Sequence, residues 1–431
     1  MKQILENYRK TYDTLLPEIN ANIEKYRKGD FHLKVQNADG TPYQGAVKVQ
    51  QTRHSFDFGT CVVMLGAMGD KEQAYRDAIT NLFNFVTTTF CWNITEIEQG
   101  KFRFDEGVQE VYRRPPAERV WQFAKENRLR AKGQPLFCDR WVPQWASKDA
   151  DELREQWIAY IKKVAQRYDG KYSLFDVVNE SFDAKRSPDM PWLKEGEFNY
   201  VKWVLKTAGE IFSDNVTLER NEATNVHFGR FSDRYYNELK EILDSGIRLD
   251  SMGMQYHYFN GKHFADVHLA GGACSLEAMY ASYQRYNTLG IPMYISEITI
   301  PTLYEGLSLQ EGEELQAEVL EKLYRLWFSI PNMQGIVYWN LKDGDAWENE
   351  GDCLGCLMDS YMRKKKSYYT LEHLIKREWN TCVTAKTGAD GTLAFSGFYG
   401  DYDVEVCCGN VVVKKKATFD KNEGTFIVEL D

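Results

Sequence analysis

The stretch "SLFDVVNES", residues 173–181, decides how the middle of this 431-residue chain is interpreted. A short apolar run leads directly into the polar pair Asn179 and Glu180. Such a run is typical of a strand that is buried on both faces, as the strands of a parallel sheet are. An unpaired carboxylate costs free energy in an apolar surround, so Glu180 must either pair with a cation or serve a function.

Seven other short stretches resemble this one, and many of them are separated by segments of helical period such as "ADELREQWIAYIKKVAQRY". Eight strands that alternate with helices predict a (β/α)8 barrel, an α/β fold. A doubly wound open sheet is the alternative, but no Gly-rich phosphate loop follows the first strand. The predicted strands are 56–62, 85–89, 130–137, 174–178, 216–219, 252–255, 293–296 and 335–339.

The two ends of the chain differ from this pattern. The first residues, to about residue 30, have the apolar spacing of a helix, with Pro17 in its middle. Residues 31–59 alternate around an Ala-Asp-Gly turn and predict a β-hairpin, and a similar alternation begins near residue 381. We therefore expect a small accessory β-rich module made from both ends. The predicted division is 1–50 (helix and hairpin), 51–378 (catalytic barrel) and 379–431 (β-module packing with the hairpin).

The composition of the chain excludes some classes of binding partner and favours others. The net charge of −10 and pI near 5.4 argue against nucleic acid, because phosphates demand a basic face. No apolar run has membrane-spanning length, so no membrane partner is expected. Aromatic residues make up 14% of the chain, and their flat faces suit sugar rings as well as cores.

The cysteines and the N-terminal residues bear on location. Nine scattered cysteines do not make a disulfide framework, and the N-terminus lacks the pattern of a signal peptide. These features predict a cytoplasmic protein, with secretion as the alternative if a signal peptide has been removed. Cys353 and Cys356 form one Cys-x-x-Cys pair, whereas a zinc site needs two more ligands, so neither a metal nor a cofactor is expected.

Polar side chains gather where the predicted strands end, which is where barrels of this class hold their active sites. Two of them are glutamates, Glu180 and Glu297. A salt bridge at the barrel mouth, with Arg140 or Arg220 as the cation, is the structural alternative for either glutamate. Other polar or aromatic residues at these ends are Asn179, Gln255, His257 and Trp339.

Two carboxyl groups across a cleft suit the hydrolysis of a glycosidic bond. One protonates the departing oxygen, and the other attacks the anomeric carbon or activates water. The carboxyl groups lie about 5 Å apart in retaining enzymes and up to about 9.5 Å apart in inverting ones. Spacing along the sequence does not distinguish these cases.

Several motifs resemble those of glycoside hydrolase family 10, the xylanase family. "FDVVNE" resembles its acid/base motif and "PMYISEITIP" its nucleophile motif. Six other segments fall in the family's order, so that the resemblance covers about residues 50 to 376. They are "RHSFDFGTCV", "WNITEIEQGKFRFDE", "GQPLFCDRWVPQW", "LERNEATN", "MGMQYHY" and "VYWNLKDGDAW".

The resemblance implies a role for each matching residue. Glu180 would be the general acid/base and Glu297 the nucleophile of a retaining double displacement. The substrate-binding residues implied are Asn179 (on a sugar 2-hydroxyl), Gln255 and His257 (orienting Glu297), Asn221 (near the acid), and Trp339 and Trp347 (lining the sugar-binding face). Each has a structural alternative: Asn179 as a helix cap, and His257 or Trp339 as core.

The sequence departs from the family where the family grips sugar hydroxyls. An acidic-amide-acidic run followed by Lys and Trp is replaced here by "TTTFCW", residues 87–92, and a Trp-His pair by Cys138 and Asp139. We expect Thr88, Trp92 and Asp139 to contact an altered glycone. The expected substrate is a short xylo-oligosaccharide or another β-glycoside rather than ordinary xylan. A carbohydrate-binding homologue with impaired catalysis is the alternative.

Overall fold

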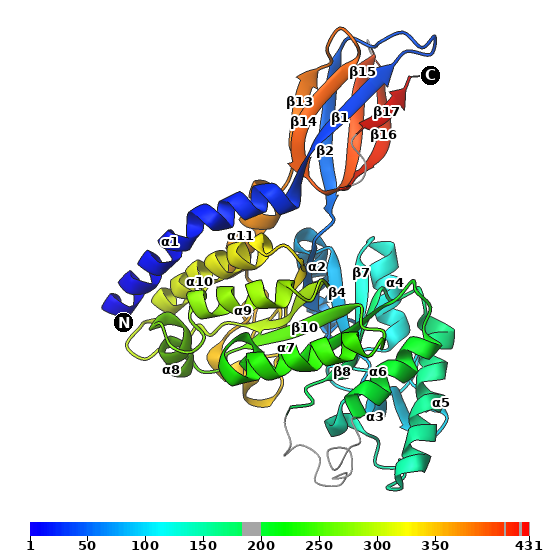
Figure 1. Cartoon of the computed structure of the whole chain (residues 1–431), viewed down its shortest axis with the longest axis vertical. Coiled ribbons are helices and arrows are strands. Elements are labelled where there is room, and N and C mark those ends of the chain that lie inside the picture. Colours follow the sequence, from blue (N-terminus) through cyan, green and yellow to red (C-terminus); the bar gives the residue numbers. More distant parts are fainter. Residues whose placement is uncertain (183–199, 409–410, 422–424, 431) are drawn as a thin grey trace.

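The computed structural model of the chain describes residues 1–182, 200–408, 411–421 and 425–430. It contains a closed barrel of eight parallel strands, which confirms the predicted (β/α)8 fold (Figure 1). The strands, in their order around the barrel, are β3 (Asp57–Cys61), β4 (Phe85–Thr89), β7 (Arg130–Gln134), β8 (Leu174–Asn179), β9 (Thr217–Glu222), β10 (Ser251–His257), β11 (Met293–Thr299) and β12 (Met333–Tyr338).

Amphipathic helices follow the strands and cover the barrel. In α7, for example, the buried residues Tyr235, Leu239 and Ile242 recur at helical spacing. The longer helices are α2 (Glu72–Leu82), α4 (Ala117–Glu126), α5 (Ala150–Tyr168), α6 (Tyr200–Ile211), α7 (Gly229–Asp244), α9 (Leu276–Asn287), α10 (Leu309–Ser329) and α11 (Lys366–His373). Short elements in the loops include α3 (Trp92–Thr95), β5 (Glu96–Glu98), β6 (Lys101–Phe102) and α8 (Gly261–Phe264).

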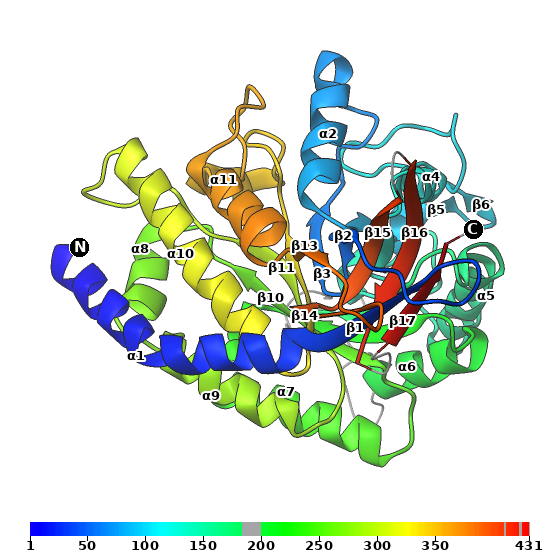
Figure 2. The same ribbon diagram turned by 90° about the horizontal axis from the view of Figure 1, so that it is seen from above.

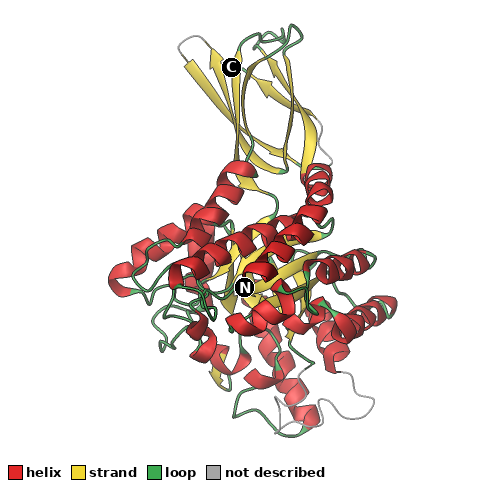
Figure 3. Cartoon of the chain, turned by 90° about the vertical axis from the view of Figure 1, so that its left-hand side faces the viewer, coloured by secondary structure: helices red, strands yellow, loops and turns green. Residues whose placement is uncertain are grey.

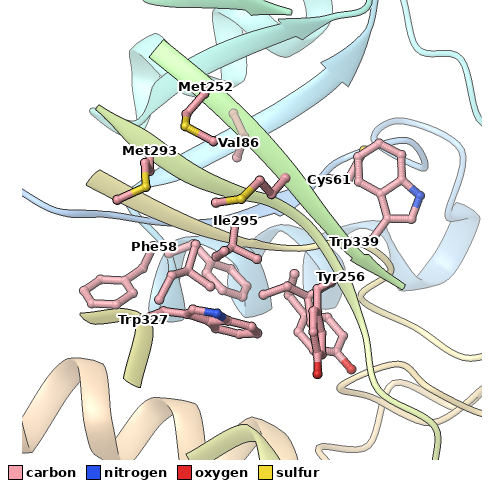
Figure 4. Packing of buried hydrophobic residues seen from close by; sticks show 14 of the residues in the cluster. Phe58, Cys61, Val86, Met252, Tyr256, Met293, Ile295, Trp327 and Trp339 are labelled. Carbon is pink, nitrogen blue, oxygen red and sulfur yellow. The ribbon is translucent and has the colours of Figure 1, made fainter. Parts of the chain in front are cut away.

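Apolar side chains from the strands pack with side chains from the helices in one large core (Figure 4). Trp327 of α10 is fully buried in this cluster. Burial of large apolar and aromatic side chains is the main favourable term that holds strands and helices together. Strand residues of the cluster include Phe58, Val86, Met252, Tyr256, Met293 and Ile295.

The barrel also buries a charged triad. Lys132 Nζ of β7 lies 2.8 Å from Asp176 Oδ1 of β8 and 2.6 Å from Glu219 Oε1 of β9. Burial by itself lowers the pKa of Lys132, but the two carboxylates outweigh it and raise that pKa above its ordinary value. Asn221 Nδ2 donates to Asp176 Oδ2 at 3.2 Å, so the triad is linked to the strand ends above it.

The accessory module is a sandwich of two sheets built from both ends of the chain, as predicted (Figure 3). One sheet has the order β14-β1-β17 and the other β13-β2-β15-β16, with apolar residues such as Leu33, Val49 and Val404 buried between them. The strands are β1 (Lys28–Gln36), β2 (Ala46–His54), β13 (Cys382–Lys386), β14 (Thr392–Phe398), β15 (Gly400–Cys408), β16 (Val411–Phe419) and β17 (Thr425–Glu429).

The hairpin predicted within the N-terminal segment does not form. β1 pairs with β14 and β17, whereas β2 pairs with β13 and β15. Each of the two strands is apolar on one side only, and the sandwich buries both apolar sides by placing the strands in opposite sheets. The loop that joins them therefore crosses between the sheets.

The N-terminal residues form one helix, α1 (Lys2–Arg27), which continues through Pro17. It lies along α10, where Arg9 pairs with Glu318 at 2.7 Å (Figures 1 and 2). At its end Arg27 Nε donates to the backbone oxygen of Phe328 at 2.6 Å. Among the described residues, no helix is both long and apolar enough to cross a lipid bilayer.

The module adjoins the end of the barrel where the strands begin. β2 ends at His54 and β3 begins at Asp57, so the chain passes directly from one unit to the other. The ring of His54 packs against Phe398 of the module and Phe328 of α10, with centroids 5.5 Å away in both cases. The C-terminal ends of the barrel strands therefore face away from the module.

Candidate active site

Strand register brings four predicted site residues to neighbouring positions. Asn179 of β8 is paired with Asn221 of β9, and Gln255 of β10 with Glu297 of β11. Glu180 follows β8 directly with a φ of 53°, a left-handed conformation that is uncommon for a residue with a side chain. These residues lie at or near the C-terminal ends of their strands, as the barrel predicts.

The strands predicted to end at Ser296 and Gln255 are longer than predicted. β11 continues to Thr299 and β10 to His257, so Glu297 lies within its strand rather than after it. The apolar pattern conceals this because a strand can carry polar side chains where one face lines a cavity.

A cavity of about 630 Å³ opens at this end of the barrel. It has the volume of a small-molecule site. Both glutamates, Glu180 and Glu297, line it. The other predicted residues that line it are Asn179, Gln255, His257, Trp339 and Trp347.

Glu297 is buried and accepts hydrogen bonds from three side chains. Gln134 Nε2 donates to Oε1 at 2.6 Å and Asn221 Nδ2 to the same oxygen at 3.3 Å. His257 Nε2 lies 3.0 Å from Oε2, and its Nδ1 lies 3.0 Å from Thr299 Oγ1. Because a carboxylate only accepts, Nε2 carries the proton of this contact. The three donors stabilise the ionised carboxylate and hold its orientation.

Glu180 is more exposed and has a different set of neighbours. Gln255 Nε2 donates to its Oε1 at 2.8 Å, and Arg140 Nη2 lies 3.6 Å from its Oε2. Gln255 also donates to Asn179 Oδ1 at 3.3 Å. One amide therefore ties Glu180 to its sequence neighbour and fixes both side chains at the cavity.

Asn221 lies just beneath the cavity and connects the two carboxyl groups indirectly. Its Nδ2 is 3.0 Å from Asn179 Oδ1 as well as 3.3 Å from Glu297, and its Oδ1 accepts from Ser296 Oγ at 2.7 Å. It is completely buried and does not line the cavity. Its position is that of a residue that orients the others.

The two tryptophans form different parts of the wall. Trp339 is nearly buried and packs edge-on against His257, with ring centroids 6.0 Å apart. Trp347 is 37% exposed and lines the cavity, with Arg114 over its ring. Cys91 also lines the wall, and burial raises the pKa of its thiol, so the thiol is neutral there.

Three of the predicted contacts do not reach the cavity. Thr88 and Asp139 are buried elsewhere, and Trp92 stacks on Tyr160 while its Nε1 donates to Glu96 at 2.8 Å. In each case a residue beside it in the sequence lines the cavity instead. Those residues are Thr89, Cys91 and Arg140.

Other residues at the cavity were missed by sequence reasoning. Gln134 is the last residue of β7, so the rule that picked out Asn179 would have found it had the strand not been extended to residue 137. Arg113 and Arg114 lie in an irregular segment before α4, where no pattern marks them. Arg140 and Trp141 follow β7 in a short helical turn, and the strand-end rule does not reach them.

The Cys-x-x-Cys pair lies outside the cavity lining. Cys353 and Cys356 are buried free thiols whose pKa burial raises. In the described part of the chain, no three or more His, Cys, Asp or Glu side chains converge as metal ligands would.

Comparison with known proteins places these observations in context. The profile of glycosyl hydrolase family 10 matches residues 48–374. The chain is 24% identical over 399 residues to anti-sigma-I factor RsgI6 of Acetivibrio thermocellus, covering 91% of this chain and 46% of that protein. It is 22% identical over 427 residues to endo-1,4-beta-xylanase 1 of Arabidopsis thaliana, covering 96% and 40%. The chain thus spans less than half the length of these two relatives.

Solved structures share the barrel. Xylanase 10B from Thermotoga petrophila RKU-1, solved in complex with xylobiose, superposes with a TM-score of 0.61 at 22% identity, covering 75% of this chain and 95% of that one. A family 10 structure from Paenibacillus barcinonensis superposes with a TM-score of 0.60 at 19% identity, covering 74% and 94%. At these identities the likeness concerns the fold.

Proposed function

Because the chain belongs to glycosyl hydrolase family 10, we propose that it hydrolyses a β-glycosidic bond with retention of configuration. One observation carries the proposal: Glu180 and Glu297 line the same cavity but are held in different ways. Glu297 is buried under three hydrogen-bond donors, whereas Glu180 is more open, accepts from Gln255 and lies near Arg140. Two carboxyl groups in unequal environments suit the two roles of this chemistry.

In the first step, Glu297 attacks the anomeric carbon and the bond to the leaving oxygen breaks. Glu180 gives its proton to that oxygen, so the leaving sugar or aglycone departs neutral. Gln134, Asn221 and His257 keep the attacking oxygens in place during this step. The product is a glycosyl ester of Glu297.

In the second step, a water molecule attacks the same carbon and Glu180 takes its proton. The ester bond breaks and Glu297 is released as a carboxylate. Two displacements at one carbon return the sugar in its original β configuration. Since Asn179 Oδ1 accepts from Asn221 and Gln255, its Nδ2 is the group left to donate to a substrate hydroxyl.

The substrate we propose is a short oligosaccharide or another β-glycoside rather than ordinary xylan. The wall that departs from the family pattern presents Thr89, Cys91 and arginines instead of the family's acidic, amide and lysine groups. Such a change alters which sugar hydroxyls are recognised, because an unpaired buried polar group is penalised.

The test compares wild type, Glu180→Gln and Glu297→Ala on aryl β-xylosides, aryl β-glucosides and xylo-oligosaccharides. We expect both variants to lose nearly all turnover, whereas Glu155→Ala, an exposed glutamate of α5, keeps it. Proton NMR should show the β-anomer first. An α-anomer as first product, or binding without turnover in the wild type, would contradict the proposal, and rapid depolymerisation of xylan would contradict the specificity.

A further inference from the structure

Three arginines line the cavity, and they come from two segments of the chain. Arg113 and Arg114 precede α4, while Arg140 follows β7. Their charges face the same space as the substrate. A neutral sugar has no charge for a guanidinium group to pair with, so the substrate of a neutral glycosidase does not explain three arginines in the cavity wall.

Arg114 is held between two indole rings. Its Cζ lies 5.6 Å from the ring centre of Trp141 and 5.5 Å from that of Trp347. The side chain is 8% exposed, and Nη1 donates to the backbone oxygen of Arg113 at 2.9 Å. Its Nε is buried without a hydrogen-bond partner, and no described carboxylate lies within ion-pair distance. Aromatic faces stabilise the cation but do not satisfy its N–H groups.

Arg113 is also oriented by the fold. It has a φ of 59° and is 2% exposed, and its Nη2 donates to Asn340 Oδ1 at 3.1 Å. Nη1 bonds the backbone oxygen of Asp345, and Nε is buried without a partner. A left-handed, buried arginine is costly and persists only where its surroundings hold it in place.

Among the described residues, the carboxylates that line the cavity do not form ion pairs with Arg113 or Arg114. Besides the two reacting glutamates, Glu348 and Glu350 line the cavity. Glu350 Oε2 instead accepts from Asn340 Nδ2 at 3.3 Å and from the backbone N–H of Trp347 at 3.4 Å, and Glu348 is exposed. Arg140, 42% exposed, pairs with Glu180 at 3.6 Å.

We propose that this part of the cavity binds a sugar that carries a carboxylate, so that the substrate is a β-glycoside or short oligosaccharide containing a uronic acid. The guanidinium of Arg114, held over Trp141 and Trp347, pairs with the carboxylate of the sugar, with Arg113 and Arg140 adding positive charge. Guanidinium groups match carboxylates in planar geometry and charge. The inference rests on the proposed function, which it makes more specific.

The first test measures binding, so that it does not depend on catalysis. Glu180→Gln protein is titrated by calorimetry with a glucuronic-acid-substituted xylo-oligosaccharide and with the same oligosaccharide after its carboxylate has been reduced to an alcohol. We expect the acid to bind at least about tenfold more tightly, as a charge-assisted hydrogen bond allows. Equal affinity, or no binding of the acid, would overturn the inference.

The second test assigns the preference to the arginine. Kinetics of 4-nitrophenyl β-glucuronide and β-glucoside are compared in wild type, Arg114→Gln, Arg140→Gln and the control Arg363→Gln, an exposed arginine outside the cavity lining. The ratio of kcat/KM for acid over neutral sugar should exceed about ten in wild type and in the control, and fall about tenfold or more in Arg114→Gln.

The outcomes separate the two proposals. If Arg114→Gln lowers kcat/KM equally for both substrates, or if wild type prefers the neutral sugar, the uronic-acid inference is wrong. The proposed hydrolytic function is not affected by that result. If calorimetry shows the preference but neither these glycosides nor aryl β-xylosides and xylo-oligosaccharides are hydrolysed, the inference stands and the hydrolytic function fails. Should Arg114→Gln not fold, the calorimetric comparison and the wild-type ratio still decide, because both test charge recognition.

Discussion

Single residues decide which strand positions reach the cavity. Thr88 and Thr89 are adjacent and chemically equal, yet only Thr89 lines it. Successive side chains of a strand point to opposite faces, and in a barrel both faces are covered, so composition does not reveal which one faces the substrate. Hydrogen-bond partners show it directly: Gln134, at a strand end, donates to Glu297 at 2.6 Å.

Replacing Gln134 tests this contact. Gln134→Leu removes the shortest donor to Glu297 while keeping a similar volume. We expect kcat/KM to fall about 10- to 100-fold, since a hydrogen bond to a charged group contributes about 1.5–3 kcal/mol. Gln122→Leu, on the exposed face of α4, is the matched control. Steady-state kinetics that are equal in the two variants would show that Gln134 does not position the carboxylate.

At the scale of the elements, the cap at the start of helix α9 contributes to the stability of the barrel. Helix α9 begins after Ser275, whose Oγ accepts from the backbone N–H of Ala278 at 3.3 Å. This cap satisfies one of the N–H groups that have no partner within the helix. α9 follows β10, the strand that carries Gln255 and His257.

Removing this cap should lower stability without touching the cavity. We expect Ser275→Ala to reduce the free energy of unfolding by about 1 kcal/mol in urea titrations. Ser282→Ala, in the interior of the same helix, should cost nothing because alanine favours helix. A Ser275→Ala protein as stable as wild type would mean that water replaces the cap.

At the scale of the whole molecule, the module joins both ends of the chain at the end of the barrel opposite the cavity. Within their sheets, β1 and β2 pair with strands from the C-terminal segment. The division at residues 50 and 378 stays a prediction. Because β2 runs to His54, one element crosses the first of these positions.

Deletion of residues 379–431 tests whether the module is one unit. The truncated chain would expose Leu33, Val47 and Val49 on unpaired edges, so we expect it to aggregate or to bind hydrophobic dyes. A second truncated protein also lacks the N-terminal strands β1 and β2, and we expect it to be more soluble than the first. Light scattering distinguishes the two, and a soluble, fully active truncation at 378 alone would contradict the interdependence.

Stability should fall at mildly acidic pH because three histidines are buried. Burial lowers the pKa of His227 and His268 to about 4 and that of His54 to about 3, from an unfolded value of 6.5. Below pH 6.5 the unfolded chain therefore binds protons that the folded chain does not, and stability is lost as pH falls from 6.5 toward these values. For His268 the loss between pH 7 and 5 is about 2 kcal/mol.

Urea unfolding at pH 7 and pH 5 checks this sign. His268→Gln should lower stability at both values, since the contacts with Tyr256 and Tyr8 are lost, but it should shrink the difference between them by about 2 kcal/mol. His263→Gln, which changes an exposed histidine, should leave the difference unchanged. An unchanged difference in His268→Gln would refute the assignment.

The sequence alone determined the barrel and the family, because local patterns carry them: short apolar strands alternate with helices, and the motifs lie at or near strand ends. It predicted the two glutamates as the reacting pair, which stays a prediction. It also indicated a β-module from both ends. Only the tertiary structure decided that β1 and β2 lie in opposite sheets, that Gln134 supports Glu297, and that Arg114 lies between Trp141 and Trp347. These depend on which segments, distant in the chain, meet across a sheet or a cavity, and no local pattern encodes such a meeting.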